Sequence, residues 1–203
     1  MIVIVDYGVG NLFSLKSSFK AIGVEAIVSG DENVIRSADK IILPGVGAFG
    51  DASDKLFNTG LAQVVIDQAK KGKPLLGICL GMQLLLERGF EYGEHKGLGL
   101  INGSIRPISD VIPKDYKIPH IGWNALNIKD AKNPLFKYIK DGDFVYFVHS
   151  FYGAECDSVV ATSEYGAPLT AVVAKGNVYG CQFHPEKSGE VGLNILKAFS
   201  ELE

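Results

Sequence analysis

Four short, mostly apolar segments in the first half of the chain restrict its fold more than any other feature, and the one at residues 2–5 is apolar throughout. They cover residues 2–5, 24–28, 40–43 and 74–78. Apolar residues with helical spacing lie at 12–22, at 52–71 with a break near Gly60, and at 80–88. A strand that is apolar at every position is typical of a sheet buried on both faces. Strands and helices alternating in this way predict a parallel sheet covered by helices.

The second half has a different pattern, in which glycine and proline separate β-rich segments. Hairpins and returning strands are predicted for 118–128, 143–149, 159–165, 169–174 and 178–183. The chain closes with an amphipathic helix whose apolar positions are Val191, Ile195, Leu196, Phe199 and Leu202. We therefore expect an α/β fold, an open and mostly parallel sheet flanked by helices with an added antiparallel β portion. A single domain is expected over residues 1–203.

Composition and charge exclude several classes of protein. Hydrophobic residues make up 47% of the 203 residues and charged residues 21%, as in globular domains rather than disordered chains. The net charge of −3 argues against a nucleic-acid binder. The chain lacks the apolar run of about 18 residues that would span a membrane. The three cysteines include no CxxC pair, so we expect neither a disulfide framework nor a metal site. The cytoplasm is then the expected compartment. We also expect no cofactor.

The segment Gly77-Ile-Cys79-Leu-Gly81 places a cysteine between an apolar strand and a helix. Small residues on both sides allow a sharp turn that exposes the middle side chain, as in the nucleophile elbow of serine hydrolases. At a helix N-terminus, unpaired amides and the helix dipole favour a thiolate over a thiol. Cys79 is therefore a candidate nucleophile, and a buried structural cysteine between packing glycines is the alternative.

The segment Phe183-His-Pro-Glu186 places a histidine at a strand end, two residues from a carboxylate. Glu186 can accept a hydrogen bond from one ring nitrogen of His184 and leave the other facing a thiol. This arrangement suits a general base and the group that orients it. A solvated loop with a surface histidine is the alternative.

The segment Pro44-Gly-Val-Gly47 follows the apolar strand at 40–43. Its glycines permit backbone amides to point into a cavity and stabilise an oxyanion. The geometry of the elbow makes the amide of Leu80 the second donor. For the isolated segment, a simple tight turn is the alternative. All three motifs follow predicted strands of one sheet, where active sites of α/β folds collect, so together they predict acyl transfer by a Cys-His-Glu enzyme.

Longer segments resemble a known family. GICLGMQ (77–83) with FHPE (183–186) resembles the class I, triad-type glutamine amidotransferases. The resemblance narrows to the glutaminase subunits of imidazole glycerol phosphate synthase through DYGVGN (6–11), LPGVGAFG (43–50), IPHIGWN (118–124) and YFVHSF (146–151). It implies a flavodoxin-like core, L-glutamine as the substrate, and transfer of ammonia to a (βα)8-barrel cyclase in histidine biosynthesis.

The same resemblance implies roles for individual residues. Cys79 is the nucleophile, His184 the general base and then acid, and Glu186 its orienting carboxylate. Oxyanion donors are implied at Gly47 and Leu80, and substrate contacts at Gln83, Glu91, Ser150 and Phe151. Positions facing the synthase partner are Asn11, Trp123, Tyr146 and Lys187. Ser150 stands where the family often has threonine, a change that a backbone role tolerates.

Other interpretations of the chain remain open. A paralogue with the same chemistry would feed a different synthase, such as one that aminates a surface sugar, and a regulatory subunit would keep the fold without activity. A cysteine peptidase on a similar fold often places its histidine directly after the nucleophile, where this chain has Leu80. His149 follows a very apolar strand and is expected to be a packed, hydrogen-bonded histidine. His120 fits the partner surface and a structural role about equally.

Overall fold

The computed structural model describes all residues, 1–203, and contains two sheets. The larger sheet has nine strands in the order β2-β1-β3-β4-β13-β12-β11-β8-β9. Its parallel part consists of β2 (Ala26–Ser29), β1 (Ile2–Val5), β3 (Lys40–Leu43), β4 (Leu75–Ile78) and β13 (Val178–Cys181). Antiparallel strands extend it through β12 (Pro168–Lys175), β11 (Val159–Glu164), β8 (His120–Ile128) and β9 (Phe144–His149). The predicted fold class is confirmed.

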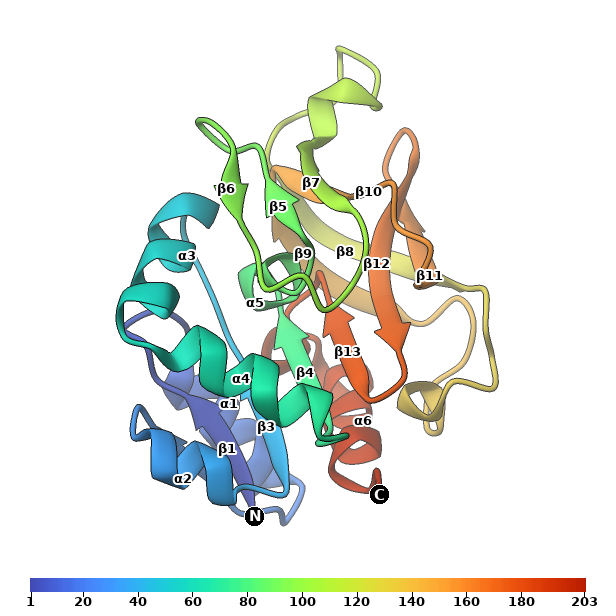
Figure 1. The fold of residues 1–203 in the computed structure, drawn as a ribbon. Helices are drawn as coiled ribbons and strands as arrows, with labels where there is room; N and C mark the ends of the chain where they lie inside the picture. The colour runs from blue at the N-terminus through green and yellow to red at the C-terminus, as the bar shows by residue number, and fades with distance from the viewer.

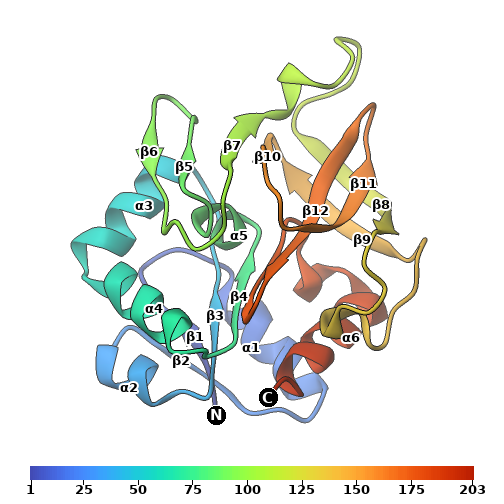
Figure 2. The ribbon, with the colours of Figure 1, turned by 45° about the vertical axis from the view of Figure 1, so that its right-hand side comes forward.

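Helices cover both faces of the parallel part (Figures 1 and 2). One face carries α2 (Glu32–Ser37), α3 (Phe49–Asn58) and α4 (Leu61–Lys70), and the other carries α1 (Leu12–Ala21) and α6 (Gly189–Ser200). Side chains alternate across a strand, so β1 contributes Val3 and Val5 to the first core and Ile2 and Ile4 to the second.

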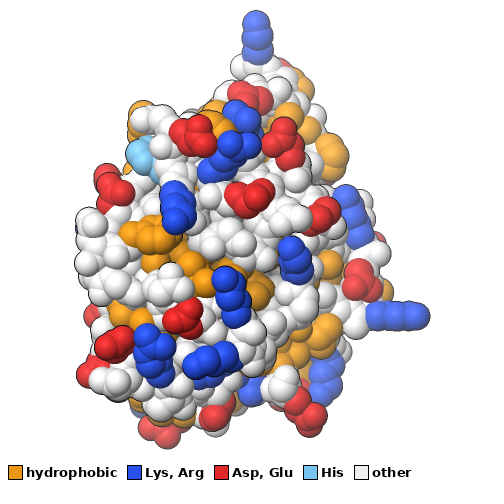
Figure 3. All heavy atoms as spheres, viewed as in Figure 1, with side chains coloured by type: hydrophobic (Ala, Val, Ile, Leu, Met, Phe, Trp, Pro, Cys, Tyr) orange, Lys and Arg blue, Asp and Glu red, His pale blue; other side chains and the backbone are white.

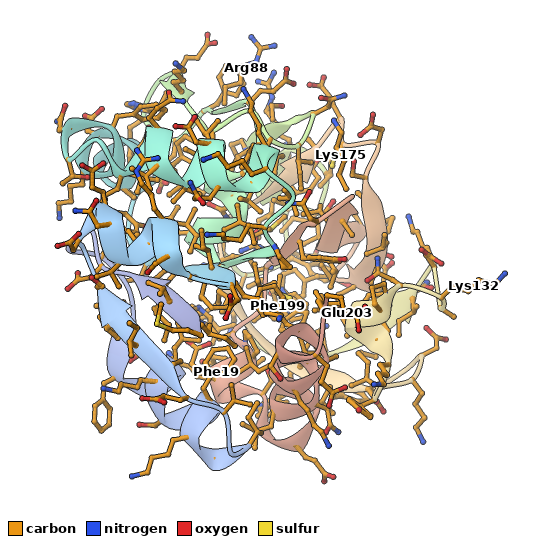
Figure 4. All side chains as sticks on the ribbon, turned by 60° about the horizontal axis from the view of Figure 1, so that its bottom comes forward. Phe19, Arg88, Lys132, Lys175, Phe199 and Glu203 are labelled. Carbon is orange, nitrogen blue, oxygen red and sulfur yellow. The ribbon has the colours of Figure 1, made fainter.

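The core beneath α1 and α6 shows how the amphipathic helices are held. Phe19 of α1 and Phe199 of α6 are fully buried there; both are labelled in Figure 4. Lys132, which lies outside this core, extends away from the molecule in the same view. Burying one such aromatic side chain contributes roughly 1.5–3 kcal/mol relative to leaving it exposed. Ile195 and Leu196 are also buried, as the spacing in the sequence predicted.

The predicted helix over 80–88 is too long, because α5 covers only Leu80–Leu84. The carbonyl oxygens of Leu84, Leu85 and Leu86 accept hydrogen bonds from amides in the distant segment 98–101. These long-range bonds satisfy the end of the helix, and the chain then forms β5 (Arg88–Gly89). Helix α2 was not predicted, although its N-cap Asp31, which accepts from the Asn33 amide at 2.7 Å, is a recognisable signal.

A second, four-stranded sheet lies at the top of Figure 1, in the order β10-β7-β5-β6. Besides β5 it contains β10 (Phe151–Ala154), β7 (Ser104–Pro107) and β6 (His95–Lys96). Short 3-10 turns occur at Ile108–Asp110, Pro134–Phe136 and Pro185–Lys187. None of the helices has the length and apolar character needed to cross a bilayer. On the face drawn in Figure 3, acidic and basic side chains are interspersed.

Candidate active site

Cys79 occupies the sharp turn between β4 and α5, with φ of 54° and ψ of −112°. Residues other than glycine rarely adopt a positive φ, and such strained positions cluster at functional sites. The flanking glycines are required sterically. A Cβ at Gly77 would lie 2.7 Å from the carbonyl oxygen of Gly81. A Cβ at Gly81 would overlap the carbonyl oxygen of Leu43. The predicted elbow is therefore the geometry that the chain adopts.

His184 follows β13 and pairs with Glu186, whose Oε1 lies 2.8 Å from the histidine Nδ1. Their side chains are only 4% and 1% exposed. Because the carboxylate accepts from Nδ1–H, the Nε2 atom is left for the thiol of Cys79. Burial lowers the pKa of His184, but hydrogen bonds with Cys79 and Glu186, together with their negative charges, raise that pKa well above its usual value. The site thus favours the protonated imidazole of His184, held between the Cys79 sulfur and the Glu186 carboxylate.

The thiol and the imidazole open on one cavity of about 270 Å³. The other lining residues are Val46, Gly47, Leu80, Gln83, Glu91, Pro119, Val148, His149, Ser150 and Phe151. This volume lies near the lower end for small-molecule sites, so the cavity suits a ligand of amino-acid size. All predicted residues of the triad, oxyanion and substrate sets line the cavity except Glu186, which stands behind His184.

The glycine loop after β3 packs directly on the nucleophile turn. The Tyr7 hydroxyl donates to the Pro44 carbonyl at 2.7 Å, which holds the start of the loop. A Cβ at Gly45 would lie 2.9 Å from the Gly81 amide nitrogen, the Leu80 Cβ and the Tyr7 hydroxyl. Gly47 has φ of +97° and lines the cavity. Burial, and then the nearby Cys79, raise the pKa of Tyr7, so its hydroxyl remains a donor.

Glu91 connects the cavity to the start of α3. Its Oε2 accepts from the Phe49 amide at 2.7 Å, and the N-cap residue Ala48 offers no side-chain cap of its own. A carboxylate at a helix N-terminus compensates unpaired amides and the positive end of the helix dipole. Glu91 therefore supports the helix that follows the glycine loop while its side chain lines the cavity.

Gln182 is a site residue that belongs to none of the predicted motifs. It is fully buried, its Nε2 lies 3.9 Å from the Cys79 Sγ, and its Oε1 accepts from Gln83 Nε2 at 3.0 Å. The same Gln83 nitrogen lies 3.4 Å from the Phe151 carbonyl oxygen. A signal existed, because a glutamine interrupts the apolar segment 178–183 two residues before His184.

Three of the predicted partner-facing residues lie together on the surface. Trp123 and Tyr146 are paired across β8 and β9 with ring centroids 6.0 Å apart, and Trp123 is 52% exposed. The Lys187 ammonium lies 6.0 Å from the Tyr146 ring centroid. Asn11 caps α1, where its side chain accepts from the Ser14 amide at 3.4 Å.

The two histidines of the β8–β9 hairpin contact each other. His120 and His149 are buried, with His120 Nδ1 3.0 Å from His149 Nε2. The prediction of a packed, hydrogen-bonded His149 is confirmed, and His120 takes the structural position rather than an exposed one. His149 also lines the cavity, a position that its sequence context did not predict. No cluster of three or more histidine, cysteine or carboxylate side chains offers a metal site.

Comparison with known proteins identifies the family. The family model "Glutamine amidotransferase class-I" matches residues 3–201. The chain belongs to the class-I glutamine amidotransferases. This amidotransferase is 51% identical to "Imidazole glycerol phosphate synthase subunit HisH" of Caldanaerobacter subterraneus subsp. tengcongensis, over 100% of its own chain and 98% of the relative. It is 50% identical to the protein of the same name from Lactococcus lactis subsp. lactis, over 98% of both chains.

Solved structures agree with the amidotransferase fold at much lower sequence identity. One, described as "Crystal structure of glutamine amidotransferase", has a TM-score of 0.76 at 19% identity and covers 98% of this chain and 100% of its own. Another, "Structure of PurLQS from Thermotoga maritima", has a TM-score of 0.75 at 22% identity and covers 98% and 96%.

Proposed function

We propose that this chain is the glutaminase subunit of imidazole glycerol phosphate synthase and acts in histidine biosynthesis. It hydrolyses L-glutamine to glutamate and ammonia and passes the ammonia to the cyclase subunit. The observation that carries the glutaminase assignment is the shared cavity of the Cys79 thiol and the His184 imidazole, with Glu186 behind the histidine. The names of relatives about half identical over the whole chain support the pathway.

The proposed mechanism assigns each step to a side chain. Gln83 and Glu91 hold the head group of glutamine, the backbone of Ser150 and Phe151 meets its α-carboxylate, and its side-chain amide lies over Cys79. The thiolate attacks the amide carbon, and the amides of Gly47 and Leu80 stabilise the oxyanion. His184 protonates the departing nitrogen, so ammonia leaves and a thioester remains. His184 then takes a proton from water, which hydrolyses the thioester and releases glutamate.

The proposed partner is a (βα)8-barrel cyclase that docks on the face carrying Asn11, Trp123, Tyr146 and Lys187. Large aromatic side chains are enriched at the centres of protein interfaces, and Trp123 is half exposed in the free chain. We expect the complex in the cytoplasm, since all three cysteines are free, with residues 1–203 acting as one domain.

The glycine loop provides a means of regulation by this partner. Idle hydrolysis of glutamine would waste ammonia, and losing one oxyanion donor typically lowers the rate about 100- to 1,000-fold. Gly45 and Gly47 allow the loop to change its backbone angles with little steric cost. We propose that docking of the cyclase places the loop in its productive form.

Glutamate release by the purified chain, measured alone and with the cyclase and its ligand, tests this proposal. We expect strong stimulation by the partner, and equal rates would exclude the regulatory role of the loop. Cys79→Ala is expected to abolish glutamine hydrolysis while the complex still uses ammonium. Glutamine-dependent turnover in that variant would refute the nucleophile assignment. Failure to restore growth of a histidine auxotroph lacking its own subunit would point to a paralogue with another synthase.

A further inference from the structure

A chain of four hydrogen-bonding contacts runs through the β8–β9 hairpin beside the cavity. His149 Nδ1 lies 2.8 Å from the Phe151 carbonyl oxygen, and His149 Nε2 lies 3.0 Å from His120 Nδ1. His120 Nε2 lies 2.8 Å from Asn124 Oδ1, and Asn124 Nδ2 donates to the Glu164 carbonyl oxygen at 3.0 Å. This series of contacts therefore begins and ends at a backbone carbonyl oxygen, a group that only accepts hydrogen bonds.

Four contacts require four protons, and the neutral side chains supply three. A neutral histidine donates from one ring nitrogen and accepts at the other. Asn124 presents its amide nitrogen to one neighbour and its oxygen to the other, whichever way the amide is turned. With both histidines neutral, one contact therefore places two acceptors face to face. A fourth proton, on the histidine pair, gives each of the four contacts one donor and one acceptor.

The surroundings of His120 suit this extra proton. Its ring is stacked on Tyr165, at a centroid distance of 3.9 Å, and on Phe147, at 5.2 Å. Aromatic faces attract cations, and Asn124 accepts from a charged imidazole as well as from a neutral one. Burial opposes the charge and lowers the pKa of both histidines. His120 is the expected proton carrier, because it contacts the two aromatic rings and Asn124, whereas burial and then the charge of the nearby His184 lower the pKa of His149.

The cavity beside the pair lacks any lysine or arginine. Its lining includes Glu91 and the groups of Cys79 and His184, and His184 is already engaged with Glu186. A carboxylate moved from water into such a site is costly unless positive charge or donors meet it. His149 lines the cavity directly beside Ser150 and Phe151, the segment assigned to the carboxylate end of glutamine.

We propose that His120 and His149 share one extra proton, and that this buried cation favours binding of the substrate's α-carboxylate. The statement about substrate rests on the proposed glutaminase function. His120 is a positioning residue that acts through His149. Through its Nδ1–H, His149 also fixes the Phe151 carbonyl, so the shared proton orders the wall of the cavity as well as charging it.

The protonation state can be measured without a substrate. The chain has four histidines, His95, His120, His149 and His184, so their side-chain ¹⁵N resonances can be assigned through single substitutions. At pH 7 we expect His120 to be protonated on both ring nitrogens and His149 to be protonated on Nδ1. Two neutral rings at that pH would overturn the proposal even if the chain proves to be an active glutaminase. If the wild type had no glutaminase activity, this measurement would still decide whether the histidine pair carries the extra proton.

The carboxylate can be tested by comparing two substrates. His120→Gln removes the titratable ring, and we expect it to raise KM for L-glutamine about tenfold, the size of effect given by loss of one charge-assisted contact. KM for L-glutaminamide, in which a neutral amide replaces the α-carboxylate, should change less than about twofold, because its binding gains nothing from the charge. Hydrolysis of the γ-amide is followed in both cases, with His95→Gln as the control. An equal loss for both substrates, or no loss for either, would contradict the proposed charge effect.

Discussion

The amide nitrogen of His184 donates a 3.0 Å hydrogen bond to the carbonyl oxygen of Tyr146. Ser188 adds two more bonds, accepting from the Tyr146 amide at 2.9 Å and donating to the His184 carbonyl at 2.6 Å. Tyr146 lies on the proposed partner face, and His184 is the proposed general base. Three hydrogen bonds therefore join the strand that would meet the cyclase to the backbone of the catalytic histidine.

Removing the Ser188 hydroxyl should weaken this connection. Ser188→Ala leaves the Tyr146 amide without its partner, while the Lys187 amide still donates to the His184 carbonyl oxygen at 3.0 Å. An unpaired polar group of this kind typically costs about 1–3 kcal/mol in the free energy of unfolding. We also expect a smaller stimulation of glutaminase by the cyclase. Urea unfolding and the ratio of turnover with and without partner measure the two effects. Ser37→Ala, which removes an exposed hydroxyl that bonds Val34 O at 2.8 Å, is the control. Unchanged stimulation in a destabilised Ser188 variant would show that the connection carries no signal.

Adding one methyl group to the glycine loop should disable the oxyanion site. The Cβ of Gly45→Ala would lie 2.9 Å from the Gly81 amide nitrogen and the Leu80 Cβ, so the loop or the nucleophile turn must move. We expect turnover to fall about 100- to 1,000-fold, the usual cost of one lost oxyanion donor. The matched control is Gly153→Ala, because its added Cβ would meet its nearest neighbours at 3.5 Å. Similar turnover in the two variants would contradict the tight packing of loop and elbow.

The carboxylate of Glu186 should set the alkaline limit of activity. Burial lowers the pKa of His184, but the contacts with Cys79 and Glu186 raise it by a larger amount, so the net pKa is raised. Neutralising Glu186 as Glu186→Gln should therefore lower this pKa, and nearby opposite charges usually account for about 1–3 units. We expect the alkaline limb of kcat/KM against pH to move to lower pH. An unmoved limb would assign it to a different group.

The same shift predicts how stability depends on pH. The pKa of His184 is raised in the folded state, so its protonation stabilises the fold fully below the unfolded value of about 6.5. This stabilisation is lost as the pH rises through the folded pKa. Wild type should therefore lose stability relative to Glu186→Gln on going from neutral to alkaline pH. Parallel curves of unfolding free energy against pH would contradict the coupling.

Two substitutions at Glu91 should separate its two contacts. Glu91→Gln keeps an oxygen for the Phe49 amide but loses the charge that we propose holds the head group of glutamine, so we expect a raised KM for glutamine with little loss of stability. Glu91→Ala loses both contacts and should in addition lower the free energy of unfolding by about 0.5–2 kcal/mol, as for a lost helix cap. Thermal unfolding and KM measured on both variants test this. Equal stability of the two variants would show that the cap contributes nothing.

Much of the fold and of the triad could be predicted because the signals are local. Continuous apolar strands, helical spacing and Gly77 each reflect steric and burial demands within a few residues. A Cβ at Gly77 would lie 2.7 Å from the Gly81 carbonyl oxygen inside the same turn, whereas Gly81 is required by a contact with Leu43 on the neighbouring strand. The family resemblance then supplied substrate and partner, which these local demands alone do not.

What the sequence could not give is the set of contacts between segments far apart in the chain. Gln182 reaches Gln83 across 99 residues, Glu91 caps a helix 42 residues away, and His120 meets His149 across 29 residues. The end of α5 differs from the predicted one for the same reason, since amides from 98–101 donate to its last carbonyl oxygens. Apolar pattern and turn chemistry determine which elements form, because they act over short distances along the chain. Which polar groups meet in the buried cavity is decided only by packing, since each must find its partner wherever the fold brings one within hydrogen-bonding distance.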